Sequence, residues 1–452
     1  MPLGDIEVKT KPKVAVIGAG LAGLSAAWLL RNKYDVTLYE RHPSAGMGVF
    51  TSNYQSNGIN SRIDIPLRIF TPNYYPNLFS LYEFLGIEME ASDHSAVFQI
   101  LTHDNKIKPF FQYKNATFFH FKLSYLARNS LNKTGIRLAY QQWRFFKTLH
   151  KDIKARNDLA SITFDEYLAD NDFDLDFIQD MLMPALAVTL TCDFDSVGQY
   201  PADLILDYLT CGVMQDGIMR ATQGVDGIVP KLSQGYEIKC NHEVIKITSN
   251  NNKTILDIQE LNTSNRIQQA FDHVIVASQA DIAAKILASN QGDYNPQAQL
   301  LKRIPIETST MVLHTDSDLL HSATTSANTG SPVSYLISRN ETRAATTVDL
   351  TKAFTTYKKQ APVFQTWHPI KQPKKESIIA QAEFTRPLVT LESREIVKQL
   401  QELNKDSQVK ICGSYMANRF PLLDAAVESS VTIARQMGAS IPWEKPEKTR
   451  TI

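Results

Sequence analysis

The chain has 452 residues, of which 43% are hydrophobic and 21% are charged, and its formal net charge is +0 at pH 7. This length supports a large core and favours two domains, while the balanced charge argues against nucleic acid as a partner. The four cysteines (Cys192, Cys211, Cys240 and Cys412) form no C-x-x-C pair, and the ten histidines show no metal-binding spacing. We therefore expect reduced thiols and no metal site.

The first dozen residues, MPLGDIEVKTKP, are polar and carry both signs of charge. Because they lack the apolar core of a signal peptide, we expect a cytoplasmic protein. Residues 13–30, KVAVIGAGLAGLSAAWLL, follow, and they predict a buried strand over 14–17 and a helix over 21–31. The glycines in this stretch argue against a membrane-spanning segment.

Gly18, Gly20 and Gly23 have the G-x-G-x-x-G spacing of a dinucleotide-binding turn. In that motif the first glycine permits a tight turn and the second lets the backbone approach a pyrophosphate. The third lets the helix pack closely on the strand. The start of the helix, at Leu21 and Ala22, supplies unpaired backbone N–H groups to an anion. We therefore predict that these five residues bind a dinucleotide.

A second predicted strand, DVTLYE, ends at Glu40, 22 residues after Gly18. A carboxylate at this point accepts hydrogen bonds from the ribose hydroxyls of a dinucleotide. It would also repel the additional phosphate of NADP, so Glu40 favours NAD or FAD. A nicotinamide enzyme would next enter its crossover helix, whereas this chain continues into a glycine-bearing loop, RHPSAGMG.

The segment YERHPSAGMGVFTSN resembles the E-x-x-x-x-x-G-G loop of the flavin amine oxidase and phytoene desaturase superfamily. The resemblance implies that FAD is the cofactor and that Arg41, Gly46, Met47 and Gly48 contact it. Met47 stands where the family has its second glycine, and Gly48 follows one place later.

Two segments in the first half of the chain are similar to further parts of this superfamily. Residues 63–88 are similar to the stretch that faces the flavin ring, although Pro66 stands where relatives commonly have glycine. Residues 222–247, TQGVDGIVPKLSQGYEIKCNHEVIKI, are similar to the glycine-rich turn, helix and strand of the family. The resemblance implies that Val244 contacts the adenine ring through its backbone.

The C-terminal segment VKICGSYMANRFPLLDAAVESSVTIARQMG is similar to the strand, loop and helix with which the family reaches the flavin. In the family this helix starts at the pyrimidine oxygen of the flavin, and here it is expected to begin near Leu423. The resemblance places Gly413 and Ser414 near the ribityl chain and the pyrophosphate. Leu422 and Leu423 complete the predicted contacts at the helix N-terminus.

The resemblance implies an α/β fold with a glutathione-reductase-type, Rossmann-like FAD-binding domain and an α+β substrate domain, both discontinuous. We assign residues 12–90, 215–290 and 405–440 to the FAD-binding domain. Residues 91–214 and 291–404 would then form the substrate domain.

Within the superfamily, PALAVTLTCDFDSVGQYPADLILDYL, TMVLHTDSDLL and KICGSYMANRF are similar to bacterial predicted NAD/FAD-binding oxidoreductases. Members of that group accompany cyclopropane-fatty-acid-synthase-like methyltransferases, which implies a small-molecule lipid substrate with an acyl chain. We therefore expect an FAD-dependent oxidoreductase that takes a hydride from an apolar or acyl-chain substrate by desaturation or dehydrogenation. No histidine or cysteine is placed for covalent attachment, so non-covalent FAD is expected. The sequence does not indicate an oligomeric state.

The stretch 106–154 is basic and aromatic, and the acidic stretch 158–177 follows it. One interpretation is a pair of helices that contacts a membrane surface and delivers a lipid to the flavin. The other, which we favour, is amphipathic helices whose aromatic side chains fill the core or a substrate tunnel. Helical periodicity is expected to continue over 164–182. The aromatic residues concerned are Phe110, Phe111, Phe118, Phe119, Phe121, Trp143, Phe145 and Phe146.

Two residues are candidates for catalysis. The resemblance places His314 in the strand on the substrate side of the flavin, where it could transfer a proton; alternatively, it is a structural histidine that pairs with Asp316 or with backbone. Arg68 could place a cation near the flavin or bind a substrate carboxylate, and the alternative is an ion pair with Asp64.

Three other functions are alternatives to an oxidoreductase that acts on an acyl chain. An amine or amino-acid oxidase that releases peroxide is one alternative. However, Ser309 or Thr310 stands near where such enzymes carry a lysine, and Leu422 replaces one aromatic residue of the amine cage. A flavoprotein that binds a lipid or a partner without turnover is the second. An NAD-only dehydrogenase is disfavoured, because it would not need the segment 413–430.

Overall fold

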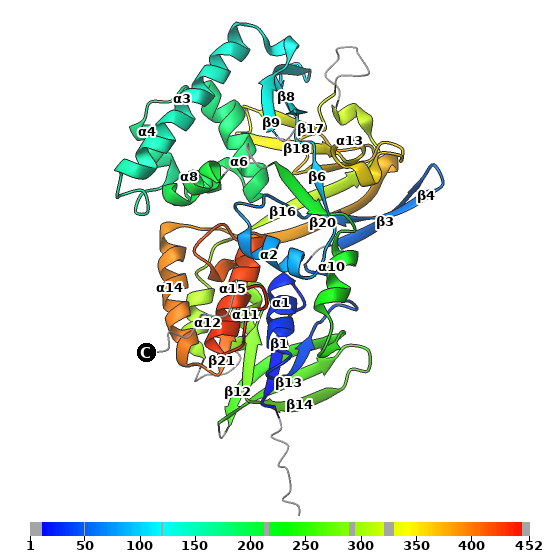
Figure 1. Ribbon diagram of the computed structural model, residues 1–452, viewed down its shortest axis with the longest axis vertical. Coiled ribbons are helices and arrows are strands. Elements are labelled where there is room, and N and C mark those ends of the chain that lie inside the picture. The colour runs from blue at the N-terminus through cyan, green and yellow to red at the C-terminus, as the bar shows by residue number, and fades with distance from the viewer. Residues whose placement is uncertain are drawn as a thin grey trace, which may run out of the picture.

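The computed structural model describes residues 11–48, 50–118, 121–211, 217–250, 252–288, 294–320 and 330–444. The molecule is elongated, with a parallel sheet and its helices at one end and a larger mixed sheet with a second group of helices at the other (Figure 1). The strands β16 and β20 and the helix α2 lie between the two ends.

A five-stranded parallel sheet has the order β11-β2-β1-β15-β21. Its strands come from three distant parts of the chain: β1 (Lys13–Ile17), β2 (Asp35–Tyr39), β11 (Glu237–Lys239), β15 (His273–Val276) and β21 (Val409–Ile411). Parallel strands need crossover connections, and α1 (Leu21–Leu30) is the crossover between β1 and β2.

Both faces of this sheet are covered, which explains why its central strand is almost entirely apolar. Val14 and Val16 pack with α1 and with α15 (Leu423–Gln436) in one core. Ala15 and Ile17 point to the opposite face because strand side chains alternate, and they join a second core. That core includes α11 (Ala280–Ala288), α12 (Asn295–Leu301) and the antiparallel sheet β12 (His242–Asn250), β13 (Lys253–Glu260) and β14 (Arg266–Phe271).

The second large sheet has eight strands in the order β20-β16-β19-β18-β17-β7-β8-β9. Only β17 and β7 pair in parallel; the other neighbours are antiparallel. The strands are β7 (Ala96–Leu101), β8 (Ile107–Phe118), β9 (Phe121–Leu126), β16 (Ile306–His314), β17 (Val333–Ser338), β18 (Arg343–Asp349), β19 (Phe364–Trp367) and β20 (Ile378–Pro387).

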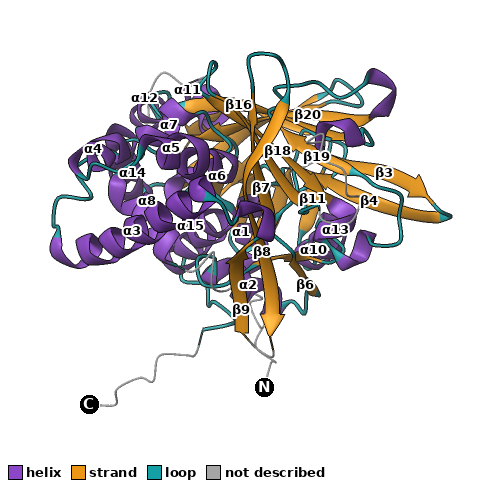
Figure 2. Cartoon of the chain, turned by 90° about the horizontal axis from the view of Figure 1, so that it is seen from above, coloured by secondary structure: helices purple, strands orange, loops and turns teal. Residues whose placement is uncertain are grey.

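Helices gather on one side of this sheet, as the view from above shows (Figure 2). They are α3 (Lys133–Ala155), α4 (Phe164–Asp170), α5 (Leu175–Phe177), the π-helical turn η2 (Ile178–Leu182), α6 (Met183–Leu190), α7 (Phe194–Gly198) and α8 (Ala202–Thr210).

The remaining elements connect the two ends or cover their edges. The strands are β3 (Phe50–Ser56) and β4 (Ile59–Ile65), which form a hairpin, and β5 (Ile69–Phe70), β10 (Ile218–Ala221) and β6 (Met89–Ser92), which form a small sheet. The helices are α2 (Pro76–Phe84), α10 (Val225–Leu232), α13 (Leu350–Ala353) and α14 (Leu391–Asp406). Single 3₁₀ turns are η1 (Arg128–Ser130), η3 (Ser317–Leu320), η4 (Thr355–Tyr357), η5 (Lys375–Ser377) and η6 (Ser414–Met416).

The α/β fold with a Rossmann-like domain is confirmed, as are the strand predicted over 14–17, the helix after it and the helix predicted near Leu423. The domain boundaries stay a prediction. All four cysteines lie in the described residues, and none forms a disulfide.

The single helix predicted over 164–182 is wrong. The chain leaves α4 at Asp172, whose φ of 45° is left-handed, and restarts where the Asp174 side chain accepts a hydrogen bond from the Phe177 N–H at 3.0 Å. Pro184 does not end a helix either. The backbone stays helical from α5 through the π-helical turn η2 into α6, since Leu182 and Met183 both have right-handed helical dihedral angles, so Pro184 lies within helical backbone directly after η2.

The close packing of α1 on the sheet gives a stability prediction. A Cβ on Gly23 would lie 1.9 Å from the Gly18 carbonyl oxygen, so Gly23→Ala forces the backbone apart. We expect the free energy of unfolding in urea to fall by about 2–4 kcal/mol. Gly20→Ala is the matched control on the same turn, because a Cβ there meets nothing within 4 Å and φ is −68°. Equal stability of the two variants would contradict the prediction.

Candidate functional site

One cavity of about 1580 Å³ runs from the glycine turn of the parallel sheet to the helices on the mixed sheet. Pockets for a single small ligand commonly measure roughly 300–1,000 Å³. The cavity therefore has room for a dinucleotide and a second molecule. No group of histidine, cysteine or carboxylate side chains in the described part of the chain could hold a metal ion.

The glycine turn leaves the N-terminus of α1 open to the cavity. Gly18, with a φ of 103°, donates its N–H to the Tyr39 carbonyl at 2.8 Å, and a Cβ there would lie 2.9 Å from the Ala277 carbonyl oxygen. Gly20 caps α1 without any side-chain hydrogen bond and lines the cavity. The first N–H groups of α1 therefore lack a side-chain acceptor and face a space in which an anion fits.

Glu40 fixes the shape of this turn. Its carboxylate accepts hydrogen bonds from the Ala19 N–H at 2.6 Å and from the His42 N–H at 2.9 Å. Each carboxylate oxygen retains acceptor capacity, and Glu40 lines the cavity. Glu40 thus orders the turn and still presents oxygens to the cavity.

The loop after β2 reaches back to the glycine turn. The Met47 N–H donates to the Ala19 carbonyl at 3.2 Å, and the Met47 side chain is buried. Met47 has a φ of 53°, in the left-handed region that favours glycine, and Gly48 has a φ of 69°. Met47 therefore adopts the conformation expected of the family's second glycine, at a cost of about 1 kcal/mol.

Two further segments complete the dinucleotide end of the cavity. On β12 the pairing with β13 shifts register between Val244 and Lys246, which leaves Ile245 without a partner residue. Val244 and Ile245 both line the cavity. At the C-terminal segment, α15 begins at Leu423 with Leu422 as its cap and has no side-chain capping bond. A second helix N-terminus therefore opens on the same space.

The structure brings nearly all of the predicted cofactor residues to one surface. Those that line the cavity are Gly18, Gly20, Leu21, Ala22, Glu40, Arg41, Gly46, Met47, Gly48, Arg68, Val244, Gly413, Ser414, Leu422 and Leu423. Gly23 does not line it, because it packs beneath the turn against Gly18.

The structure does not bring His314 to the cavity. His314 is fully buried at the end of β16, its Nε2 pairs with the Thr366 hydroxyl at 2.8 Å, and its Nδ1 accepts the Asp316 N–H at 3.2 Å. The catalytic interpretation is therefore corrected to the alternative, a histidine that is held by structural hydrogen bonds.

Arg68 lines the cavity, but the ion pair with Asp64 is not formed by direct contact. Asp64 instead accepts the Val225 N–H at 3.0 Å, and burial raises the pKa of Asp64 to about 6. Arg68 donates Nη2 to the carbonyls of Met47 and Gly48 at 3.2 and 2.7 Å. Burial and, to a smaller extent, the charge of Arg386 lower the pKa of Arg68 to about 10.

Sequence reasoning missed Arg386, which is the penultimate residue of β20 and also lines the cavity. It stands in the segment EFTRPL, which carries no motif. The one available signal was an arginine next to a proline at the end of a strand. Only the tertiary structure shows that Arg386 lies near Arg68.

The far part of the cavity is apolar and aromatic. Its wall comes from the mixed sheet and from the helices on it. The residues are Phe98, Phe111, Phe145, Phe146, Phe177, Met181, Leu182, Leu186, Leu209 and Tyr335. Phe98 and Tyr335 stack in this wall with ring centres 4.5 Å apart. Such a surface favours an apolar ligand.

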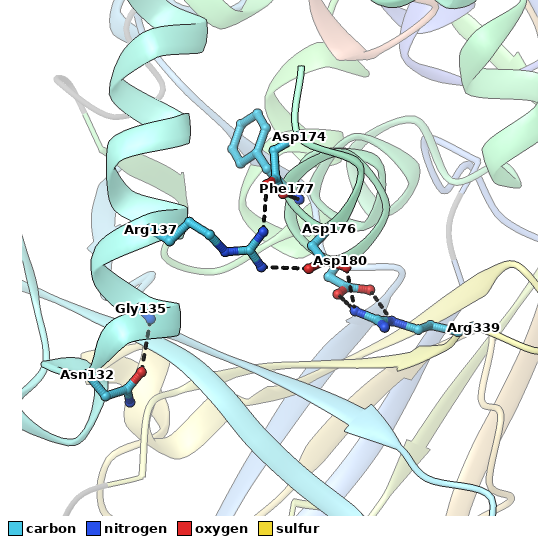
Figure 3. Close-up of polar contacts among 8 residues, drawn as sticks. All are labelled: Asn132, Gly135, Arg137, Asp174, Asp176, Phe177, Asp180 and Arg339. Carbon is cyan, nitrogen blue, oxygen red and sulfur yellow. Dashed lines mark hydrogen bonds and ion pairs between the residues drawn. The ribbon is translucent and has the colours of Figure 1, made fainter. Parts of the chain in front are cut away.

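An ion-pair network outside the cavity holds this wall in place (Figure 3). Arg137 of α3 bonds Asp174 at 2.6 Å and Asp176 at 2.5 Å. Arg339, after β17, bonds Asp176 at 3.1 Å and the buried Asp180 at 3.0 Å through its Nε. The network joins three elements to the π-helical turn η2, and π-helical turns occur frequently at functional sites.

The aromatic side chains of residues 106–154 lie on two different surfaces. Phe111, Phe145 and Phe146 line the cavity, which fits the interpretation that aromatic side chains fill the core or a tunnel. Tyr140 and Trp143, on the outer face of α3, are more than half exposed. The side chains of Phe118, Phe119 and Phe121 lie outside the described residues. Contact with a membrane surface stays a prediction, and the described helices include none with the length and apolar character of a membrane span.

The position at which an amine oxidase would carry its lysine holds a buried serine. Ser309 is buried on β16 and donates its hydroxyl to the Thr191 carbonyl at 2.6 Å, while the Trp367 indole donates to the same hydroxyl at 3.3 Å. These bonds place Ser309 in the core between β16 and the helices.

Comparisons with known proteins agree with this architecture. Residues 16–85 match the model of a NAD(P)-binding Rossmann-like domain, and no curated protein sequence matches the chain. Among solved structures, the chain is similar to a fatty acid isomerase from P. acnes that produces CLA, with a TM-score of 0.65, 14% identity, and coverage of 94% of this chain and 98% of that one.

Two amine oxidases are similarly close. Cyclohexylamine oxidase from Brevibacterium oxydans has a TM-score of 0.64 and 13% identity, and the match covers 95% of this chain and 100% of that one. A double mutant of putrescine oxidase gives a TM-score of 0.64 and 13% identity with the same coverage. At these identities the likeness establishes a shared fold and nothing further.

Gly20→Ala tests the glycine turn as a binding element. The added methyl group would occupy the space in front of α1 without disturbing the fold. We expect unchanged stability but a roughly tenfold or greater loss of bound dinucleotide, measured as the ratio of flavin to protein absorbance after reconstitution. Full retention of the dinucleotide by this variant would show that it binds elsewhere.

His314 predicts a pH dependence of stability. Burial lowers the pKa of His314 from 6.5 to about 4. Between these values the unfolded chain binds one more proton, so stability is lost as pH falls from about 6.5 to 4. The loss amounts to at most about 3 kcal/mol. His314→Gln should flatten this decline in urea unfolding measured at pH 5 and pH 8, whereas His150→Gln, an exposed control, should not. An unchanged decline in His314→Gln would refute the assignment.

Proposed function

We propose that the protein is an FAD-dependent oxidoreductase that takes a hydride from an apolar or acyl-chain substrate, by desaturation or dehydrogenation. The observation that carries the proposal is the single cavity. At one end it has a glycine turn and two uncapped helix N-termini, and at the other a wall of aromatic and aliphatic side chains.

The residues present fit FAD. The open space at Gly20 accepts a pyrophosphate at the N-terminus of α1, and Glu40 would accept hydrogen bonds from the adenosine ribose. Val244 would meet the adenine through its backbone. The N-terminus of α15 at Leu423 would stabilise negative charge on the reduced ring. The described residues that line the cavity include His42, His94 and His242 but no cysteine, and non-covalent binding stays part of the proposal.

When bound, FAD supplies the electron-accepting chemistry. The chain itself supplies binding, orientation and the exclusion of water. The loop at Met47 and Gly48, held by Arg68, would fix the cofactor against the sheet. The wall at Phe145 and Met181, held from outside by the ion-pair network, would orient an apolar chain.

Two further points support an acyl-chain substrate. One solved structure with the same fold is a fatty acid isomerase. The sequence also resembles oxidoreductases that accompany cyclopropane-fatty-acid-synthase-like methyltransferases. A lipid substrate also accords with the large apolar part of the cavity.

Amine or amino-acid oxidation is the second candidate, favoured by the likeness to two amine oxidases. The charges in the cavity oppose amine oxidation. Arg68 and Arg386 both line it, and two guanidinium groups disfavour an ammonium substrate. Neither Ser309 nor Thr310 can take the part of a lysine.

The spectrum of the purified protein, followed by anaerobic reduction, tests the proposal. We expect a yellow protein that releases unmodified FAD on heating and whose visible flavin band is bleached by an acyl substrate without oxygen. A panel of primary amines should not bleach the band or yield peroxide.

Each of the other outcomes points to a different function. Bleaching by amines with peroxide release would establish the oxidase alternative. A flavin that no candidate substrate reduces would favour a binding protein without turnover. A colourless protein that takes up no flavin would refute the proposal.

A further inference from the structure

We infer that Arg386, together with Arg68, binds a carboxylate on the substrate, so that the substrate is an acid and not an ester, alcohol or hydrocarbon. This inference rests on the proposed function, because it assigns the second molecule in the cavity. It starts from Arg386, which has no ion-pair partner among the described residues and whose guanidinium carbon lies 6.0 Å from the centre of the Phe384 ring.

Arg386 is the penultimate residue of β20, is only partly exposed and lines the cavity. Among the described residues none accepts a hydrogen bond from its buried Nε, and none forms an ion pair with it. Burial lowers the pKa of Arg386. A buried guanidinium without a counter-ion costs several kcal/mol, so a ligand that supplies the anion would be bound strongly.

The second cation makes the region more positive. The charge of Arg386 lowers the pKa of Arg68, which shows that the two guanidinium groups lie close enough to repel each other. The Nε of Arg68 is also buried without a hydrogen-bond partner. Both arginines line the cavity, and the planar guanidinium group of arginine binds a carboxylate through paired N–H donors.

Nearby acids do not neutralise the pair. Asp64 accepts the Val225 N–H at 3.0 Å and forms no direct ion pair with either guanidinium group. Glu383 also lines the cavity, but it is exposed and stands three residues from Arg386 on β20. Its side chain therefore points to the opposite face of the strand. Glu307 stands opposite Arg386 in the pairing of β16 with β20, but two donors of α7 and its N-cap already bond its carboxylate at 2.8 Å. Among the described residues, the position of a counter-ion to Arg386 is thus left to a ligand.

A phosphate of the cofactor is the other source of such an anion. Arg386 is close to Tyr75, Tyr200 and Cys192, whose ionised forms would interact with its charge. Tyr200 and Cys192 belong to the helical layer that builds the apolar wall. The phosphate donors of the glycine turn belong to the parallel sheet. The position of Arg386 therefore favours the substrate over the pyrophosphate.

Laurate, dodecanol and methyl laurate serve as matched probes on the flavin-loaded protein, with affinity measured by calorimetry or by the shift of the flavin spectrum. We expect laurate to bind roughly tenfold or more tightly than the two uncharged probes. Arg386→Gln should remove this preference, leave dodecanol binding unchanged and leave the flavin content unchanged. Arg343→Gln is the control, since Arg343 pairs with Glu341 outside the cavity.

The inference is overturned if wild-type protein binds laurate and dodecanol equally, a comparison that needs no variant to fold. It is also overturned if Arg386→Gln loses flavin while the preference for laurate persists, since Arg386 would then serve the cofactor. Arg386-dependent laurate binding by a protein that takes up no flavin would support the carboxylate site and refute the proposed function.

Discussion

The contact between the Gly18 carbonyl and Gly23 is the constraint on which the rest of the site depends. Because neither residue carries a side chain, α1 packs directly on the carboxyl end of β1. The first N–H groups of the helix then face the cavity and not the protein. Glu40 holds the same turn from β2 through the Ala19 N–H. A polar end thus forms in an otherwise apolar cavity before any ligand is present.

The other walls depend on chain segments that are far apart in sequence. The parallel sheet draws strands from three parts of the chain, so Val244 and Leu423 come to the same cavity as Gly20. The apolar wall needs support of a different kind. Short helices near residues 175–190 have few turns of their own, and the ion pairs of Arg339 and Arg137 fix them to the sheet and to α3.

The distribution of charged groups makes the two parts of the cavity suitable for two different ligands. Uncapped helix ends and the glycine turn suit phosphates, while the guanidinium groups of Arg68 and Arg386 lie where the parallel sheet gives way to the helical layer. Arg68 donates hydrogen bonds to the carbonyls of Met47 and Gly48, whereas no acceptor among the described residues bonds the Nε of Arg386. Met47, which stands where the resembled family has glycine, has a φ of 53°, in the left-handed region that favours glycine.

The sequence by itself determined the local structure that depends on neighbours along the chain. The spacing of Gly18, Gly20 and Gly23 and the position of Glu40 define a dinucleotide turn, and the apolar run before them defines a buried strand. The local pattern also gave a wrong prediction. Apolar periodicity predicted one helix over 164–182, although the chain interrupts the helix at Asp172 and starts a new one at Asp174. Only the tertiary structure decided that His314 is buried away from the cavity and that Arg386 lies near Arg68. Residues at such distances in sequence meet because strands pair across the sheet, and pairing partners leave no mark in the local pattern.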